Sequence, residues 1–198
     1  MRDDRLKSTN NIDNKRDLYD PSFEHDSCGI GFLVNIKGNK NHKIIEDALV
    51  MSEKMEHRGG CGCEENTGDG AGLLIQMPDK FFRGICDEGA FNLPDLDWYG
   101  AGLVFLSMSE KERVAQKLAI EKIIKEEGQS ILGWRDIPVN DLLIGPTANN
   151  SRPYIEQIFI ARNKQLATSE AFERKLYIIR KRAERKESTP YQENIYFP

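Results

Sequence analysis

Blocks of apolar residues, separated by polar and glycine-rich stretches, predict a chain of short strands and amphipathic helices. Residues 1–27 are rich in Asp, Asn, Lys and Arg and show no apolar periodicity, which predicts a flexible leader. Apolar runs bounded by Gly or Pro predict strands, and these runs occupy residues 30–36, 71–77, 99–107, 131–139 and 154–161.

Three further segments have apolar residues at helical spacing. The first helix is predicted at residues 43–56, where it would cover a sheet. The second begins at a capping box that runs from Ser109 to Glu112 and ends at Gly128, and the third occupies residues 169–186. The stripes expected to face the sheet are Ala115, Leu118, Ala119 and Ile123 in the second helix and Phe172, Leu176, Ile179 and Ala183 in the third. Strands flanked by helices predict layers of helix on sheet.

Length and charge narrow the class of protein. A chain of 198 residues predicts one domain with a core of its own. Its net charge of −4 is spread along the chain and provides no basic stripe for nucleic acid. No apolar run approaches the roughly 20 residues that span a bilayer, and the N-terminus lacks the apolar segment of a secretory signal. We therefore expect a soluble, cytoplasmic protein that binds neither nucleic acid nor membrane and keeps its four cysteines as free thiols.

Cys28 lies where the polar leader stops and the first predicted strand begins. A cysteine thiol needs a base to become a nucleophile near neutral pH, because its ordinary pKa is about 8.5. Cleavage between Ser27 and Cys28 would supply that base, since the new α-amine has a pKa near 8 and lies beside the sulfur atom. From spacing alone, a small buried cysteine at the edge of a strand is the favoured explanation of the residue.

A glycine-rich stretch, residues 57–72, is the second candidate for chemistry. Glycines at this density suit a loop folded around a small anionic or zwitterionic ligand, and Arg58 could bind a carboxylate. A tight structural loop with a surface arginine is the alternative. A dinucleotide site is excluded because a helix precedes the glycines and a strand follows them. A metal site is disfavoured because His57, Cys61 and Cys63 give at most three ligands at cramped spacing.

An ordered set of motifs resembles the N-terminal domain of the glutamate synthase large-subunit family. The similarity runs from about Leu18 to the end of the chain. It is carried by Tyr19-Asp20-Pro21, Asp26-Ser27-Cys28-Gly29-Ile30-Gly31-Phe32, Glu56-His57-Arg58-Gly59, Thr67-Gly68-Asp69-Gly70-Ala71-Gly72, residues 131–139 and residues 153–160. The resemblance implies an α+β fold, the four-layer αββα arrangement of N-terminal-nucleophile hydrolases, incomplete in this chain. It also implies a propeptide at residues 1–27 and the N-terminal part of a class II glutamine amidotransferase domain at residues 28–198.

The same resemblance implies residue roles. Cys28 would be the nucleophile, and its α-amine the general acid and base. Arg58 would be the active-site arginine near the nucleophile. Gly29 and Gly31 would let substrate and backbone approach, and Gly59 would serve the neighbouring loop. Glutamine would be hydrolysed to glutamate and ammonia, and the ammonia would then combine with 2-oxoglutarate in a flavin-bearing synthase domain.

One part of the family pattern is missing. The family's oxyanion hole uses an Asn-Gly pair far downstream, and this chain contains no Asn-Gly dipeptide. We therefore expect a truncated piece that needs no cofactor itself, whereas the full-length family implies FMN and an iron–sulfur cluster. The remaining synthase domains, and a small subunit or ferredoxin, are the implied partners, with NADPH, NADH or ferredoxin left open as electron donor. Two alternatives remain: a catalytically silent segment that acts in folding or subunit association, and another class II amidotransferase.

Overall fold

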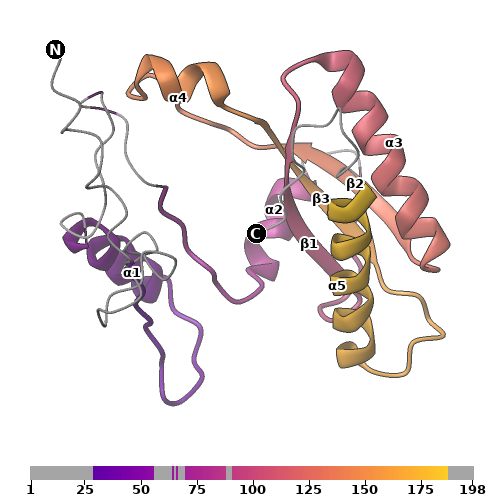
Figure 1. Cartoon of the computed structure of the whole chain (residues 1–198). Coiled ribbons are helices and arrows are strands. Elements are labelled where there is room, and N and C mark those ends of the chain that lie inside the picture. Colours follow the sequence, from indigo (N-terminus) through magenta and orange to yellow (C-terminus); the bar gives the residue numbers. More distant parts are fainter. Residues whose placement is uncertain (1–28, 56–63, 65, 67–69, 88–90, 187–198) are drawn as a thin grey trace, which may run out of the picture. The chain divides into compact units, whose positions relative to one another are not determined.

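A computed structural model describes residues 29–55, 64, 66, 70–87 and 91–186 (Figure 1). These residues fall into two compact units. The N-terminal unit contains residues 29–55 and 70–73, and the sheet unit contains residues 64, 66, 74–87 and 91–186.

The sheet unit is built on a three-stranded antiparallel sheet. Its strands are β1 (Tyr99–Leu106), β2 (Ser130–Asp136) and β3 (Tyr154–Ala161), in the spatial order β1-β3-β2. A register shift between Ile131 and Gly133 marks a bulge in β2. The three strands confirm the strand predictions in this half of the chain, although β2 ends three residues before the predicted limit. Mixed helices and this small antiparallel sheet confirm the α+β class.

Two helices, α3 (Glu110–Glu126) and α5 (Ser169–Lys186), pack on one face of the sheet (Figure 1). The predicted stripe of α5 is confirmed, because Phe172, Ile179 and Ala183 are buried and Leu176 packs against the same cluster. A Cβ atom at Gly100 of β1 would lie 2.5 Å from Leu176 Cδ1, so the glycine permits close approach of this helix. This face holds the larger core of the unit, which joins Val104, Leu106, Ile158 and Ile160 to both helices.

The opposite face of the sheet carries a smaller aromatic cluster. Its centre is Phe159, which is fully buried and makes an edge-on contact with Phe82. Phe82 and the buried thiol Cys86 belong to α2 (Asp79–Asp87), a helix that the sequence analysis did not predict. Phe91 adds a second aromatic contact to Phe159. The sheet therefore has apolar packing on both faces.

The predicted inner face of α3 is confirmed only in part: Ile123 is buried and Ala119 half-buried, but Ala115 and Leu118 are exposed. The buried residues are Gln116, Ile120, Ile123 and Ile124, whereas Leu118 is 60% exposed. Gln116 is buried because its side-chain oxygen accepts a hydrogen bond from the backbone N–H of Ser107 at the end of β1. Gln116 shares the buried face with Ile120, Ile123 and Ile124.

The predicted capping box is also wrong. Ser109 is the N-cap residue of α3, but its side chain makes no capping hydrogen bond. The hydroxyl of Ser107 instead accepts from the backbone N–H of Ser109 and donates to Glu112. The predicted end of the helix is confirmed, because Gly128 has a φ of +74°, a left-handed conformation that favours glycine.

The N-terminal unit contains α1 (Lys43–Lys54), which confirms the first predicted helix. None of its residues is buried, and the expectation that it covers a sheet stays a prediction. The segments predicted as strands at residues 30–36 and 71–77 form no strand. Several of their apolar side chains are exposed; Ile30 is 95% exposed. A strand requires hydrogen-bonding neighbours along its edge, and the sheet pairs only β1, β2 and β3 among the described parts of the chain.

Candidate functional site

The sequence-predicted site residues are only partly within the described structure. Cys28, Arg58 and Gly59 lie outside the described residues. Gly29 and Gly31 are described and exposed, in the segment that precedes α1. The structure therefore gives geometry for two of the five predicted residues.

Gly31 lies against helix α1. A Cβ atom at this position would be 2.6 Å from Met51 Sδ and 2.8 Å from Met51 Cε. A glycine here allows the extended segment to approach the helix. The expected role of Gly31 in close approach thus has a structural counterpart, but the neighbour is a methionine side chain of the same unit.

Glu64, in the glycine-rich stretch, is held by a residue far along the sequence. Its carboxylate accepts hydrogen bonds from the backbone N–H of Thr147, at 3.1 Å to Oε2, and from the Thr147 hydroxyl, at 2.6 Å to Oε1. The backbone carbonyl of Asn66 accepts from the N–H of Gly145 at 3.4 Å. We call these contacts the Glu64–Thr147 clip. Thr147 lies in the first turn of α4 (Pro146–Ser151), where backbone N–H groups have no acceptor within the helix.

Helix α4 belongs to the long connection between β2 and β3, residues 137–153, which we call the arm (Figure 1). Three contacts join the two ends of the arm. The hydroxyl of Tyr154 donates to Asp136 at 3.0 Å, the N–H of Ile137 donates to the carbonyl of Ile155, and Arg152 forms an ion pair with Asp141. The arm is therefore cross-linked where it leaves the sheet.

A second polar cluster joins α2 to the start of β1. The hydroxyl of Tyr99 donates to Asp79 at 2.8 Å, and Arg83 donates to both carboxylate oxygens of Asp79. Burial of the Tyr99 phenol, followed by its hydrogen bond to Asp79, raises its pKa well above the ordinary value. Arg83 also donates to the carbonyls of Leu93 and Pro94. The cluster fixes the segment that leads from α2 into β1.

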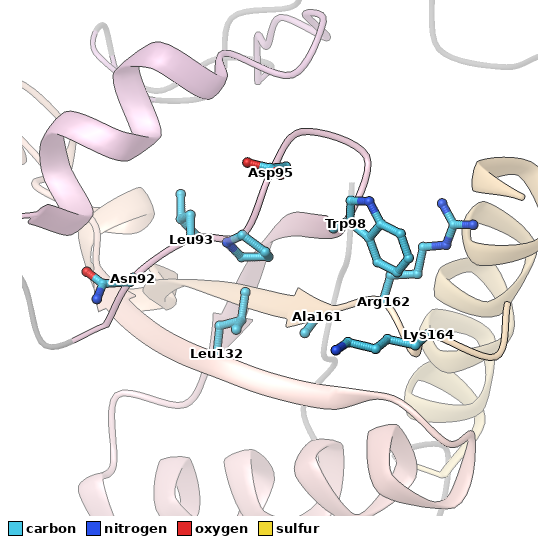
Figure 2. Close-up of a pocket in the computed structure, with 9 residues that line it drawn as sticks. Asn92, Leu93, Asp95, Trp98, Leu132, Ala161, Arg162 and Lys164 are labelled. Atoms are coloured by element: carbon cyan, nitrogen blue, oxygen red, sulfur yellow. The ribbon is translucent and has the colours of Figure 1, made fainter. Parts of the chain in front are cut away.

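That segment forms one wall of a pocket of about 560 Å³ (Figure 2). The strands contribute Leu132 and Ala161 to its lining, and the loop after β3 contributes Arg162 and Lys164. The remaining lining residues are Asn92, Leu93, Pro94, Asp95 and Trp98. None of them is among the residues singled out by sequence.

Arg162 lines this pocket next to Trp98. Its guanidinium lies 4.7 Å from the centroid of the Trp98 ring, and Figure 2 shows the two side chains next to each other. Its donors bind the carbonyls of Leu166 and Asp97, so they serve the fold rather than a ligand. Asp97 itself has a positive φ of 73°, which is uncommon outside glycine but tolerated by aspartate in turns. The pocket is thus a well-fixed, mainly apolar depression.

The described part of the chain shows neither a metal-binding group of side chains nor a membrane-spanning helix. It contains no group of three or more His, Cys, Asp and Glu side chains placed to hold a metal ion. Among its helices, none has the length and apolar character needed to cross a membrane.

Comparison with known proteins decides the family. Residues 28–198 match the family described as glutamine amidotransferases class-II. The chain belongs to this family. The match covers the glycine-rich stretch, the clip, the arm and the whole of the sheet unit.

Three relatives of the chain are named glutamate synthases, and their names give three different electron donors: NADPH, ferredoxin and NADH. The chain is 47% identical over 175 residues, 88% of its length, to the large chain of glutamate synthase [NADPH] from Bacillus subtilis. It is 37% identical over 181 residues, 91% of its length, to ferredoxin-dependent glutamate synthase 1 from Arabidopsis thaliana. It is 36% identical over 183 residues, 88% of its length, to glutamate synthase [NADH] from Saccharomyces cerevisiae. These matches confirm the resemblance that the ordered motifs indicate.

The chain spans only about a tenth of the length of the relatives it matches, 11% for the first two and 8% for the third. Sequence reasoning missed the clip, because Glu64 and Thr147 are far apart along the chain and a hydrogen bond between them leaves no local pattern. Pro146 in the first turn of α4 was the available signal, since proline is favoured at the start of a helix.

Proposed function

We propose that residues 28–198 are the N-terminal part of the class II glutamine amidotransferase domain of a glutamate synthase large chain. In this proposal residues 1–27 are a propeptide whose removal exposes Cys28. The observation that carries it is the family match, which begins at residue 28, together with relatives that are all named glutamate synthases. The activity would be glutamine hydrolysis in the cytoplasm, supplying ammonia for the synthesis of glutamate from 2-oxoglutarate.

Cys28 would act as nucleophile with its own α-amine as the base. The amine takes the thiol proton, and the sulfur attacks the carboxamide carbon of glutamine. The amine then returns a proton to the leaving nitrogen, so that ammonia departs and a γ-glutamyl thioester remains. Water hydrolyses the thioester to glutamate and restores the thiol. An α-amine with a pKa near 8 is well matched to this exchange of protons near neutral pH.

The other predicted residues would shape the glutamine site. Arg58 would hold its loop beside the nucleophile and offer a planar guanidinium to a carboxylate. Gly29 and Gly31 would keep the backbone next to Cys28 open, and Gly59 would do so in the neighbouring loop.

The four-layer αββα arrangement is part of the same proposal. The second sheet would be supplied by parts of the full-length protein outside the sheet unit. The exposure of Ile30, Phe32, Val34 and Leu74 supports this, because such apolar side chains need a covering. Helices α3 and α5 would be the outer layer on the first sheet.

An iron–sulfur cluster does not fit the residues of this segment. A cluster is commonly held by four cysteine thiolates, and Cys86, one of the chain's four cysteines, is buried in the apolar cluster around Phe159. We assign the cluster and FMN to the remaining synthase domains of the same polypeptide. Those domains, with a small subunit or ferredoxin, would be the partners of this segment, and glutamine would be its ligand.

The proposal is tested on the full-length protein by N-terminal sequencing, intact mass and a glutaminase assay. We expect a mature chain that starts at Cys28, and glutamine hydrolysis that falls at least 1,000-fold in Cys28→Ala, since loss of a nucleophile removes the covalent route. A mature protein that retains Met1 and hydrolyses glutamine fully would contradict the N-terminal cysteine mechanism.

A second candidate function is a silent role in folding or subunit association. The absence of an Asn-Gly dipeptide favours it for this 198-residue segment, because losing one oxyanion donor commonly lowers turnover by about 100- to 1,000-fold. Glutamine turnover by the 198-residue chain that is abolished by Cys28→Ala would exclude the silent role.

A further inference from the structure

Four aliphatic residues of the arm are exposed to solvent. Leu142 is 87% exposed and Leu143 is 78% exposed, and Val139 and Ile144, close to them in the sequence, are also exposed. We propose that these four residues, the apolar segment, form a docking surface for the part of the full-length polypeptide that follows residue 198. The inference rests on the proposed function, in which this chain is one part of a longer protein, and it adds the surface by which that part contacts the rest.

The apolar segment opens a stretch of the arm that carries no charge. Residues 142–151 contain no Asp, Glu, Lys or Arg, although these four residue types make up 30% of the chain. Neighbouring exposed apolar residues usually mark an interaction site, and the core of a protein interface is depleted of charged residues. An uncharged, aliphatic segment therefore fits an apolar groove on another protein domain.

The base of the arm is fixed to the sheet unit by several contacts. The hydroxyl of Tyr154 donates to Asp136, and Arg152 forms an ion pair with Asp141. The guanidinium of Arg113 on α3 lies 3.9 Å from the centroid of the Tyr154 ring, which ties this base to the core. Because these contacts already restrict the arm, docking removes fewer of its conformations and costs less conformational entropy.

The arm is longer than a connection between adjacent antiparallel strands needs to be. It occupies residues 137–153, whereas hairpin loops usually have about 2–5 residues and long loops are commonly functional. Figure 1 shows the arm extending away from the three strands. The apolar segment therefore lies beyond the sheet, where another domain can contact it.

The length of the proposed full-length protein identifies the partner. The chain spans 11% of the Bacillus subtilis relative, so most of such a polypeptide lies outside this chain. Strongly apolar interfaces are typical of permanent contacts rather than of contacts that form and separate. Domains of one polypeptide meet at a high effective concentration, which favours a permanent contact between them. We therefore expect the groove to belong to the same polypeptide and to be lined by aliphatic and aromatic side chains.

Photo-cross-linking of the full-length protein tests which surface covers the apolar segment. Leu142→p-benzoylphenylalanine places a photoreactive ketone in the segment, and Asn150→p-benzoylphenylalanine places the same group at an exposed position of α4 as the matched control. Denaturing electrophoresis separates cross-links within one polypeptide from those between two, and mass spectrometry locates the attachment point. We expect a cross-link within one polypeptide, to a residue beyond 198, at a yield at least about five-fold above that of the control.

Hydrogen exchange in the full-length protein tests the same contact with a pair of charge substitutions. The double variant Leu142→Asp, Leu143→Asp puts two carboxylates into the proposed interface, and Asn149→Asp, Asn150→Asp adds the same charge to α4. All four residues are exposed, so neither change alters the core of the sheet unit. We expect the protection factors of the backbone amides at 142–144 to fall at least about ten-fold in the leucine variant, because a carboxylate in an apolar groove is costly, and to stay unchanged in the asparagine variant.

Three results would overturn the inference alone. They are a cross-link that doubles the mass of the polypeptide and so assigns the segment to a contact between two copies, a cross-link that returns to residues 1–198, and yields and protection factors equal to those of the asparagine controls. A full-length polypeptide that ends at Pro198 would overturn the proposed function and this inference together. A longer protein that shows the expected cross-link but no glutaminase activity would overturn the proposed function and support the docking surface.

Discussion

Lys117 of α3 and Glu156 of β3 form an ion pair between the helix and the sheet. The side chain of Glu156 is 6% exposed and that of Lys117 is 26% exposed. The ammonium of Lys117 also lies 4.7 Å from the centroid of the Trp134 ring, whose N–H donates to Glu121. Loss of Lys117 would leave a buried carboxylate without its counter-charge.

We expect Lys117→Met to lower the free energy of unfolding of the 198-residue chain by about 2–3 kcal/mol, because an uncompensated buried charge is costly. Lys122→Met is the control, since Lys122 forms an exposed pair with Glu126 at 4.0 Å; it should change the free energy by less than about 0.5 kcal/mol. Urea unfolding measures both variants. Equal losses in the two would show that the burial of Glu156 has no energetic consequence.

Two substitutions test which serine hydroxyl, that of Ser107 or that of Ser109, stabilises the start of α3. We expect Ser107→Ala to destabilise the chain by about 1 kcal/mol, because the Ser107 hydroxyl binds both Glu112 and the N–H of Ser109. Ser109→Ala should cost clearly less, since the Ser109 side chain makes no capping bond. Thermal unfolding of the two variants checks the order, and the reverse order would restore the capping box predicted from sequence.

Gly100 controls the packing of α5 on β1. Gly100→Ala should lower the free energy of unfolding by about 1–3 kcal/mol, because the new methyl group would lie 2.5 Å from Leu176 Cδ1 and force the helix or the side chain to move. Gly72→Ala provides the comparison, since no atom lies within 4 Å of the position of its Cβ. Chemical denaturation that fails to separate the two variants would mean that Leu176 moves aside without cost.

Glu127 should make stability depend on pH. Hydrogen bonds from Lys175 and Arg182 hold its pKa below the ordinary value of 4.5. A carboxyl group whose pKa is lower in the folded state stabilises that state above its unfolded pKa, and this contribution is lost as the pH falls through the folded pKa.

We therefore expect Glu127→Gln to be less stable than the wild-type chain at about pH 7, with the difference shrinking below about pH 4.5. Urea unfolding across that range measures the difference in the free energy of unfolding. Glu173→Gln, which removes an exposed carboxylate of α5, should track the wild-type chain. A difference between Glu127→Gln and wild type that is constant with pH would point to packing rather than charge.

Local sequence patterns correctly predicted those elements of the sheet unit in which the apolar side chains are also the buried ones. The continuous apolar runs of β1 and β3 are typical of strands with both faces covered, the stripe of α5 has one buried side, and the structure shows both patterns. Ile120, Ile123 and Ile124 lie at helical spacing on the buried face of α3, but the burial of Gln116 could not be predicted, because its hydrogen bond with the end of β1 leaves no periodicity. Helix α2 was missed because it is short and contains Gly84, and its stability depends on the contacts of Phe82 and Cys86 with the sheet.

The predictions for residues 30–36 and 71–77 failed for a different reason. Their composition suits strands, but a strand exists only where another segment offers hydrogen bonds along its edge, and composition does not supply that neighbour. The candidate site likewise combines residues that the sequence could suggest with a contact that it could not. The roles of Cys28, Arg58 and Gly59 came from the resemblance and stay predictions, whereas the Glu64–Thr147 clip depends on a long-range contact that only coordinates reveal.

The spatial order of the strands has a consequence for how the chain is made. β3 is the last of the three strands in the sequence, yet it lies between the other two. During synthesis, β1 and β2 are therefore both made before the strand that pairs with each of them. Their edges and apolar faces are open to chaperones, or to pairing with other nascent chains, until β3 has emerged from the ribosome.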